Sequence, residues 1–521
     1  MCGLFGTTIE GPPTPQVLAA LRRCRDSLTH RGPDHQGDWH DARLYLGHTR
    51  LSIVDTSAAG HQPMLSDDGA LVLTVNGEIY NYRALRSQLE GHVSFRSDSD
   101  SEVLLHGYRA WGMAGLLERL RGMFAFALFD SESQQLHLAR DPIGIKPLYL
   151  WHVGAHLAWA SELKALQALA QETALRLPPL ESDHSALYDF LTYRYVPAPK
   201  SLYQNVTKLR PGTWVSFDLS SGQLRETRYW SLPPCETGAP VADDVLTPAL
   251  AQAVDGHLQA DVTVGALLSG GLDSSVVVSF AAEQMQNLAT FSLGFGSARS
   301  ELPLAREVAQ RYNTEHHETQ LDDADLQHGL ARLRQWFDEP FVDTSAYPLH
   351  AVARLARNRV KVVLTGDGGD ELFAGYPRYG DARLRCLTRA SRGGAQALAQ
   401  WRHRAPILDR PLRALERYGL LQGFDYYARV MGGMTRFEKT GYRRYWQLPD
   451  DYEDYWHYRE HYDARLDPVS ALRRLEFLTY LPDDLLVKVD RVTMALGLEA
   501  RVPLLDQALV ELVFSRPATQ I

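Results

Sequence analysis

The stretch of the chain best suited to chemistry is Ser-Gly-Gly-Leu-Asp-Ser-Ser at positions 269–275. The apolar, β-branched run over residues 261–268 predicts a buried strand, and the residues from Ser274 onward predict a helix. Between them, Gly270 and Gly271 let the backbone turn tightly and approach a ligand closely. The helix directs its unpaired N–H groups and the positive end of its dipole at that ligand, so this turn favours pyrophosphate.

This turn differs from the common nucleotide-binding loop. It lacks a Gly-Lys-Ser/Thr ending, so no lysine reaches the outer phosphates from the loop itself. Asp273 stands there instead, and an acid beside a phosphate site indicates that Mg²⁺ lies between the two. A bare Ser-Gly-Gly is equally typical of a structural bend, but the complete stretch directly after a buried strand is much more specific.

A second candidate loop, Thr-Gly-Asp-Gly-Gly-Asp-Glu at positions 365–371, follows the short apolar strand predicted over residues 360–364. It contains three glycines and three acids. Such a loop at the end of a parallel strand, where ligands of α/β sheets bind, indicates that something positive is bound. The alternative is an exposed acidic turn.

Cys2 is the candidate nucleophile of the N-terminal half. Removal of the initiator Met1 would leave Cys2 with both its thiol and a free α-amino group. An α-amino group has a pKa of roughly 7.7–8.0, so it can act as a base near neutrality, and one residue then supplies both nucleophile and base. A lone cysteine is more often a small buried apolar residue, so this interpretation needs support from other residues.

Five stretches of the N-terminal half provide that support. They are Cys-Gly-Leu-Phe-Gly at 2–6, His-Arg-Gly-Pro-Asp at 30–34, Arg-Leu-Ser-Ile-Val-Asp at 50–55, Asn-Gly-Glu-Ile-Tyr-Asn at 76–81 and Ser-Asp-Ser-Glu at 99–102. Together they resemble the glutaminase domain of class II glutamine amidotransferases, over about residues 2–165. The resemblance implies that the Cys2 thiolate attacks the side-chain amide of glutamine.

The same resemblance implies roles for the residues around Cys2. Asn76 and the backbone N–H of Gly77 would stabilise the tetrahedral oxyanion. Arg50 would pair with the α-carboxylate of glutamine and Asp100 with its α-amino group, while Glu78 would orient neighbouring groups. Taken alone, Asp100 is equally typical of an acid at a helix N-terminus, and Arg50 of a surface ion pair.

The loop at 269–275 resembles the pyrophosphate loop of ATP pyrophosphatases, which split ATP between its α and β phosphates. With the loop at 365–371 it resembles asparagine synthetase-type enzymes. The resemblance implies that Asp273 and Asp370 share Mg²⁺ on the pyrophosphate, and Asp367 stands where many relatives carry a catalytic Glu. An Asp is one carbon shorter, which leaves the acid–base geometry open. The implied ATP-binding set is Leu267, Ser269, Gly270, Gly271, Asp273, Ser274, Leu293, Thr365 and Gly366.

The final part of the chain is predicted to be helical. Residues 483–491 and 499–506 also match the family, and for most of them we expect helix packing with surface charges. Family members usually continue with a segment whose lysine contacts the pyrophosphate and the carboxylate being activated, and no counterpart follows here. The sequence leaves three explanations open: a truncated product, substitution by Lys488 or an arginine, or impaired synthesis.

Composition excludes several classes of protein. Of the 521 residues, 45% are hydrophobic and 22% charged, and the net charge of −9 offers no electrostatic footprint for nucleic acid. The four cysteines lack the spacing of a disulfide framework or a zinc site. No apolar run is long enough to cross a bilayer and no signal sequence is present, so we expect a cytoplasmic protein without a membrane partner. The oligomeric state stays open, with a homodimer as one option.

The predicted fold class is α/β with two domains. Alternating strands and helices after residue 261 predict a doubly wound parallel sheet, followed by a helical C-terminal part. The glutaminase resemblance implies an N-terminal nucleophile fold, an αββα sandwich of two antiparallel sheets between helical layers. We place the domains at residues 2–210 and 236–521, the second apparently without the usual C-terminal segment.

The resemblance implies glutamine-dependent asparagine synthesis. Glutamine hydrolysis at Cys2 would supply ammonia to a β-aspartyl-AMP made from aspartate and ATP, giving asparagine, glutamate, AMP and pyrophosphate. Ammonia would be protonated in open water, so we expect a sealed passage between the domains. Two alternatives remain: an amidotransferase for another carboxylate, such as a polysaccharide or antibiotic precursor, and a protein that keeps the fold without synthetase activity.

Overall fold

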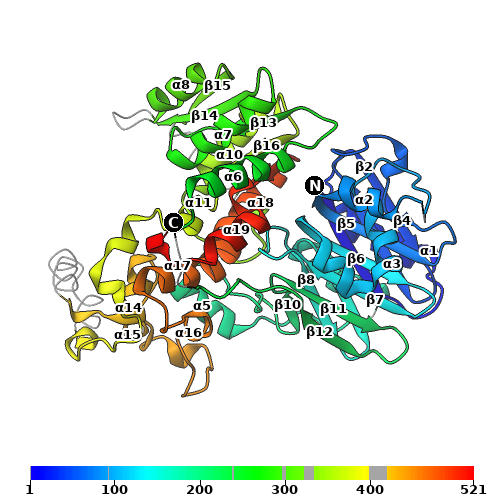
Figure 1. Ribbon diagram of the computed structural model, residues 1–521. Coiled ribbons are helices and arrows are strands. Elements are labelled where there is room, and N and C mark those ends of the chain that lie inside the picture. Colours follow the sequence, from blue (N-terminus) through cyan, green and yellow to red (C-terminus); the bar gives the residue numbers. More distant parts are fainter. Residues whose placement is uncertain are drawn as a thin grey trace.

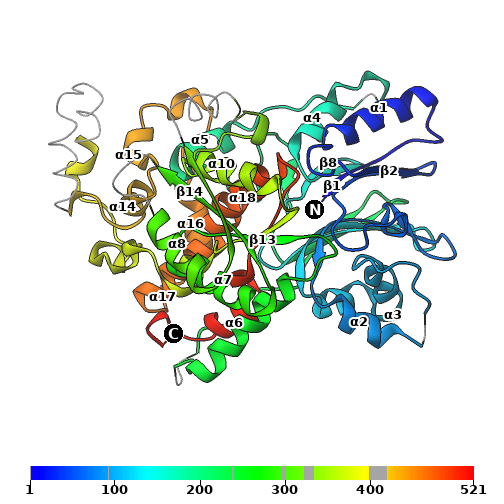
Figure 2. The same ribbon diagram turned by 90° about the horizontal axis from the view of Figure 1, so that it is seen from above.

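The computed structural model describes residues 2–91, 93–175, 177–236, 240–295, 301–321, 332, 334–397 and 419–520. Met1, whose removal is expected, lies outside the described residues. The N-terminal part is built on two antiparallel sheets and the C-terminal part on one parallel sheet (Figure 1). Both ribbon views place the beginning of the chain on the side of the N-terminal part that faces the C-terminal part (Figures 1 and 2).

The first antiparallel sheet has the strand order β10-β8-β9-β1-β3-β2. Its strands are β1 (Cys2–Thr8), β2 (His35–His40), β3 (Leu44–Arg50), β8 (Tyr149–Val153), β9 (His156–Ala160) and β10 (Val206–Lys208). Helices α1 (Pro15–Asp26) and α4 (Leu163–Gln171) cover its outer face.

The second antiparallel sheet has the strand order β12-β11-β7-β6-β5-β4. Its strands are β4 (Met64–Leu65), β5 (Leu71–Ile79), β6 (Gly122–Asp130), β7 (Gln135–Arg140), β11 (Thr213–Asp218) and β12 (Leu224–Arg228). Helices α2 (Tyr82–Leu89) and α3 (Glu102–Arg119) pack on its outer face, opposite α1 and α4 (Figure 2).

Alternation of side chains along these strands explains the layers. On β5, Val72 faces the other sheet, whereas Leu73 and Val75 pack against α2 and α3. On β1, Leu4 lies between the sheets and Phe5 packs against α1 and α4. Three apolar layers result, and the predicted αββα sandwich is confirmed.

The C-terminal sheet is parallel throughout, with the order β15-β14-β13-β16-β17. Its strands are β13 (Val264–Leu267), β14 (Ala289–Phe295), β15 (Glu315–Leu321), β16 (Val362–Leu364) and β17 (Glu499–Arg501). In chain order, β14 and β15 lie on one side of β13, and β16 and β17 follow on its other side. The predicted doubly wound sheet is therefore confirmed, with its switch point between β13 and β16.

Helices cover both faces of this sheet. Helices α6 (Asp243–His257), α7 (Leu272–Gln284) and α8 (Leu302–Arg311) pack on one face, and α10 (Ala346–Arg357) and α18 (Leu486–Met494) pack together on the other. The remaining α-helices with printed bounds are α5 (His184–Tyr193), α11 (Gly369–Phe373), α14 (Gly423–Val430), α15 (Arg436–Lys439), α16 (Trp456–His461), α17 (Pro468–Leu478) and α19 (Gln507–Phe514).

The last part of the chain differs from the sequence-based expectation. Residues 499–501 form the edge strand β17 instead of a helix, and the side chains of Glu499 and Arg501 are fully buried. Asp490 and Arg491 of α18, expected on the surface, are also buried. The reason is that these charges lie at the contact with the N-terminal part and pair with each other or with residues of that part.

One apolar cluster crosses from the N-terminal to the C-terminal part. Its members include Leu51, Ile53, Val54, Met123, Ile143 and Leu232 on one side, and Val264, Ala266, Leu268, Leu481, Leu485 and Leu504 on the other. The two parts therefore share a continuous hydrophobic core. Among the described helices, none has the length and apolar character needed to cross a membrane.

Candidate active sites

Cys2 lies where the ends of the two antiparallel sheets meet. It begins β1, and the antiparallel register with β3 places it directly opposite Arg50. Its backbone N–H donates a hydrogen bond of 3.0 Å to Asn76 Oδ1, from β5 of the second sheet. Cys2 is only 6% exposed, and burial raises the pKa of its thiol. A nearby base is therefore required to form the thiolate.

The side-chain amide of Asn76 and the backbone at Gly77 lie beside Cys2 in fixed positions. With its Oδ1 held by Cys2, the buried Asn76 Nδ2 has no hydrogen-bond partner among the described residues. At Gly77, φ is +154° and a Cβ would lie 2.0 Å from the carbonyl oxygen of Met123, so only glycine fits. An unused, buried amide donor beside a thiol suits stabilisation of an oxyanion.

The guanidinium of Arg50 shapes the loop after β3. Its Nη1 donates to the carbonyl oxygen of Ser57 at 3.0 Å, and its Nη2 donates to those of Val54 at 3.2 Å and Asp55 at 2.5 Å. These bonds use three of its five N–H groups. The N–H of Nε and one N–H of Nη1 remain. Arg50 can therefore hold a carboxylate with its two remaining N–H groups while the other three fix the loop.

Asp100 and Glu78 form a buried acidic pair near this loop. An oxygen of Asp100 accepts the backbone N–H of Ile79 at 2.7 Å, and burial raises the pKa of Asp100 to about 6. Burial and the carboxylates of Glu499 and Asp100 raise the pKa of Glu78 well above its usual value. Arg501 lies 3.6 Å from Glu78, yet the pKa of Asp100 stays raised, so Asp100 would gain from a further cation, such as the α-ammonium group of an amino acid.

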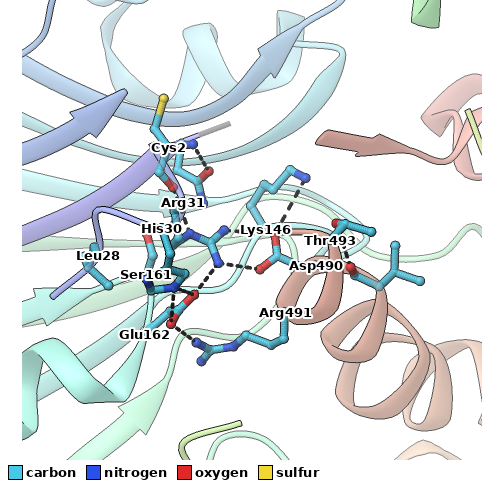
Figure 3. A network of polar contacts seen from close by, with 12 residues as sticks. Cys2, Leu28, His30, Arg31, Lys146, Ser161, Glu162, Asp490, Arg491 and Thr493 are labelled. Carbon is cyan, nitrogen blue, oxygen red and sulfur yellow. Dashed lines mark hydrogen bonds and ion pairs between the residues drawn. The ribbon is translucent and has the colours of Figure 1, made fainter. Parts of the chain in front are cut away.

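A buried ion-pair network connects Cys2 to the C-terminal part (Figure 3). Arg31 donates from Nε to the carbonyl oxygen of Cys2 at 3.0 Å and from Nη1 to Glu162 at 2.7 Å. Its Nη1 and Nη2 donate to the two oxygens of Asp490 at 2.8 and 3.0 Å. Arg491, the next residue of α18, pairs with Glu162 at 2.8 Å. The sequence placed Arg31 in a motif but gave no sign of these partners.

The second site is a cavity of about 760 Å³ at the carboxyl ends of β13 and β16, at the switch point of the sheet. Of the predicted residues, those that line it are Leu267, Ser269, Gly271, Asp273, Ser274, Leu293, Thr365, Gly366, Asp367 and Asp370. Gly270 packs behind the turn, with φ of +82°, and a Cβ there would lie 2.7 Å from the backbone nitrogen of Ala305. The structure thus brings both predicted loops to one cavity.

Glycines allow the two loops to touch. A Cβ on Gly366 would lie 2.7 Å from the backbone nitrogen of Ser274, and one on Gly369 would lie 2.6 Å from Asp273 Oδ2. The Asp273 carboxylate therefore rests against the main chain of the other loop. Burial, with the charges of Asp370 and Asp367, raises the pKa of Asp273 to about 6. This set of mutually repelling carboxylate oxygens fits Mg²⁺, which would relieve the repulsion.

A buried lysine lies beside this cavity. Lys488 Nζ donates to Ser345 Oγ at 2.8 Å and lies 3.2 Å from Asp343 Oδ2. Burial alone would lower the pKa of Lys488, but the carboxylates of Asp367, Asp343 and Asp484 outweigh it and raise the pKa. The raised pKa favours the charged form of Lys488, and such a charge can attract a phosphate.

Comparison with known proteins finds one family match in each half of the chain. Residues 1–230 match the glutamine amidotransferase domain family and residues 246–520 match the asparagine synthase family. The putative asparagine synthetase [glutamine-hydrolyzing] of Mycobacterium tuberculosis is 35% identical, over 99% of this chain and 82% of its own. Asparagine synthetase [glutamine-hydrolyzing] 1 of Bacillus subtilis is 33% identical, over 99% and 81%. Amidase chry2 of Gibberella zeae is 28% identical, over 96% and 79%.

An Ntn-type sandwich joined to an ATP-pyrophosphatase sheet defines an ATP-dependent, glutamine-hydrolysing ligase. The match to the relatives extends over nearly the whole chain, across both domains and their contact. The chain therefore belongs to the glutamine-hydrolysing asparagine synthetase family.

Proposed function

We propose that this enzyme converts aspartate to asparagine, with glutamine as the nitrogen donor and ATP as the activating substrate. One observation carries the proposal. A buried cysteine beside an unused amide donor lies in one domain, an acid-lined, glycine-built cavity lies in the other, and a single apolar cluster spans both domains. That arrangement suits an enzyme that makes ammonia in one domain and consumes it in the other.

At the first site, the Cys2 thiol attacks the carboxamide carbon of glutamine and forms a tetrahedral oxyanion. After Met1 is removed, the α-amino group of Cys2 accepts the thiol proton and passes it to the departing ammonia. Asn76 Nδ2 and the Gly77 N–H stabilise the oxyanion. Water then hydrolyses the thioester to glutamate. Arg50 holds the α-carboxylate of glutamine, and Asp100 holds its α-ammonium group.

At the second site, the β-carboxylate of aspartate attacks the α-phosphorus of ATP, and pyrophosphate leaves. The turn at Gly271 and the N-terminus of α7 face the pyrophosphate, and Lys488 supplies a positive charge near Asp367. Mg²⁺, held by Asp273 and Asp370, would neutralise the charge of the leaving pyrophosphate. The backbones at Leu267 and Leu293, together with Thr365 and Gly366, hold the adenylate.

Ammonia then attacks the acyl carbon of β-aspartyl-AMP and AMP leaves, and in this proposal Asp367 accepts the proton. Ammonia stays nucleophilic only while it is neutral, so it must cross between the domains without meeting bulk water. The shared apolar cluster provides surroundings in which the charged form is disfavoured. We propose that ammonia crosses through this cluster.

The acceptor carboxylate can be identified by product analysis. Purified enzyme is supplied with ATP, Mg²⁺ and amide-labelled ¹⁵N-glutamine, and products with aspartate are measured by mass spectrometry. Labelled asparagine formed in equal amounts with AMP and pyrophosphate supports the proposal. Pyrophosphate release with another carboxylic acid and none with aspartate would overturn the assignment of the acceptor.

Another acceptor carboxylate is the second candidate function. It is favoured by the likeness over 96% of this chain to a relative named as an amidase instead of an asparagine synthetase. A panel of carboxylic acids, each tested for pyrophosphate release in the same assay, separates the two candidates.

A further inference from the structure

A second cavity, of about 260 Å³, lies at the contact between the two domains and shares no lining residue with the nucleotide cavity. Arg210 and Pro211 line it from the N-terminal side, and His457, His461 and Asp483 line it from the C-terminal side. The proposed reaction uses none of these residues.

Two histidines and an acid converge beside this cavity. His457 and His461, the second and the last residue of α16, are four positions apart, so both lie on one face of the helix. With Glu460, they bring one ligand atom each to within 4.8 Å of one another. The spacing His-x-x-Glu-His is also found in helical zinc sites.

An independent observation concerns the ring of His457. The residue is 2% exposed and lines the cavity, yet neither ring nitrogen makes a hydrogen bond to any described residue. Its closest polar contact runs from Nε2 to Asp483 Oδ2 at 3.4 Å, which is long for a hydrogen bond. Asp483 thus serves Nε2, whereas Nδ1 of this buried imidazole has no partner among the described residues and is available to a ligand.

The residues around His457 and Glu460 resemble the outer partners of metal ligands, which hold the ligands in place by hydrogen bonds. Asp483 is anchored by the backbone N–H of Ala198 at 2.8 Å, so it can orient the ring of His457 as carboxylates do beside metal-binding histidines. Arg210 binds Oε1 of Glu460 at 2.8 Å, which leaves the other carboxylate oxygen available. The positive charge of Arg210 would repel a bound cation, but its ion pair with Glu460 neutralises part of that charge.

We propose that His457, Glu460 and His461 bind one divalent transition-metal ion of the zinc class. Two imidazoles and one carboxylate favour Zn²⁺ over Mg²⁺ or Ca²⁺, which prefer oxygen ligands. The fourth ligand would be water from the cavity. All three protein ligands belong to α16, and the ion would lie beside Arg210 and Ala198 at the contact between the domains.

Cobalt provides the test, because Co²⁺ bound by nitrogen and oxygen in four-coordinate geometry absorbs visible light strongly, whereas six-coordinate Co²⁺ among oxygens absorbs weakly. Full-length protein treated with a chelator is titrated with Co²⁺ in the absence of ATP. The proposal expects strong absorption that saturates at about one equivalent, and a higher melting temperature with Zn²⁺.

The matched variants are His461→Gln and Glu460→Gln, with exposed His40→Gln as the control. The first two should lose the strong absorption and the Zn²⁺-dependent rise in melting temperature, while His40→Gln keeps both. Melting temperatures without metal show whether each variant folds. Weak absorption in the wild type, or strong absorption that survives His461→Gln, would overturn the proposal.

A second inference rests on the network around Arg31 and on the proposed role of Cys2. Helix α18 reaches both sites: Leu485, directly before its first residue, lines the nucleotide cavity, and Asp490 holds Arg31 (Figure 3). Arg31, in turn, holds the carbonyl oxygen of Cys2. We infer that Asp490 is a positioning residue, which fixes Cys2 through Arg31 and relays the state of the nucleotide site to it.

The test compares Asp490→Asn and Asp490→Glu with the surface variant Asp463→Asn. Loss of the Asp490 charge removes the carboxylate that holds both Nη atoms of Arg31 and leaves Glu162 to hold Nη1 alone, so glutaminase kcat should fall about 10- to 100-fold with little change in KM. Asp490→Asn should also lose any stimulation of glutaminase by ATP and aspartate, and Asp490→Glu should recover part of the rate. Ammonia-dependent synthesis should stay near the wild-type rate.

Two outcomes would contradict this role. One is an unchanged glutaminase rate in Asp490→Asn, and the other is an equal fall in both activities. Cys2→Ala is measured alongside: if it retains glutaminase activity, the proposed function itself fails. If Cys2→Ala is inactive and Asp490→Asn is normal, only the positioning role fails.

Discussion

The two candidate sites are built in opposite ways. Around Cys2 the groups are closed in, since Cys2, Asn76 and Asp100 are each at most 6% exposed, and they come from separate strands and loops. The nucleotide site is a large cavity made mainly by two continuous glycine-rich loops. A closed site suits a small zwitterion and a reactive thioester, whereas a wide, acid-lined cavity suits a polyphosphate that arrives with a cation.

The sites also differ in what fixes their geometry. Near Cys2, hydrogen bonds between the two sheets and the guanidinium of Arg50 set the positions of the groups. In the nucleotide site, backbone contact at Gly366 and Gly369 does so. Removal of a polar partner should therefore damage the first site, and addition of a methyl group should damage the second.

The largest effect is expected for Asp273→Asn. Loss of one of the carboxylates that would hold Mg²⁺ should lower pyrophosphate release about 10³-fold, because the charge of the leaving group is then poorly neutralised. Glutaminase activity should stay within about twofold, since the nucleotide site lies in another domain. Both rates are measured on the same preparation, and a matched loss of both would show that the sites are not separable.

The next effect is expected for Asn76→Ala. Removal of the unused Nδ2 donor should lower glutaminase kcat by roughly 10²–10³-fold with a smaller change in KM, because this donor acts mainly on the oxyanion. Ammonia-dependent synthesis should be unaffected and serves as the control for folding. A rise in KM alone would instead assign Asn76 to substrate binding.

The matched pair Gly369→Ala and Gly393→Ala tests the contact between the loops. A Cβ at Gly369 would collide with the Asp273 carboxylate, whereas at Gly393 no heavy atom lies within 4 Å. Displacement of Asp273 should lower pyrophosphate release about 10²-fold in the first variant. The second should behave like the wild type, and equal effects of the two would argue against a role for close packing.

The smallest effect concerns pH. Burial raises the pKa of Asp100 to about 6, so below that pH the carboxyl is protonated and loses the charge that binds an α-ammonium group. Protonation of the α-amino group of Cys2, with a pKa near 8, already lowers kcat/KM for glutamine as the pH falls. Between pH 7 and pH 5, protonation of Asp100 should lower it about tenfold further. Asp100→Asn should remove this second limb of the profile. If the variant keeps the limb, another group causes it.

The sequence predicted the nucleotide loops well because their signal is local. A buried strand, two glycines and the beginning of a helix follow one another directly in the sequence. In the structure these are β13, the turn at Gly270 and Gly271, and α7. Apolar runs also predict strands over residues 71–75, 123–129, 136–139, 148–153 and 157–160, and β5 and β6 extend beyond their runs. Strand β15 was not predicted, because Glu315–Leu321 is mostly polar and shows no apolar run.

The charges at the domain contact could not be predicted in this way. Asp490 and Arg501 resemble surface residues in sequence, because their partners lie far away in the chain or belong to another element. Arg31 is separated from Asp490 by 459 positions. No periodic pattern reports such a pair, and only the folded contact explains why three residues of β17 can bury Glu499 and Arg501.

The central claim is that one domain releases ammonia and the other uses it. The most direct test is to supply Cys2→Ala with ATP and aspartate, with either glutamine or ammonium chloride as nitrogen source, beside Cys235→Ala as the control. We predict that Cys2→Ala makes no product from glutamine and makes it from ammonia at about the wild-type rate. Loss of both activities in a folded Cys2→Ala protein, or continued use of glutamine, would contradict the account.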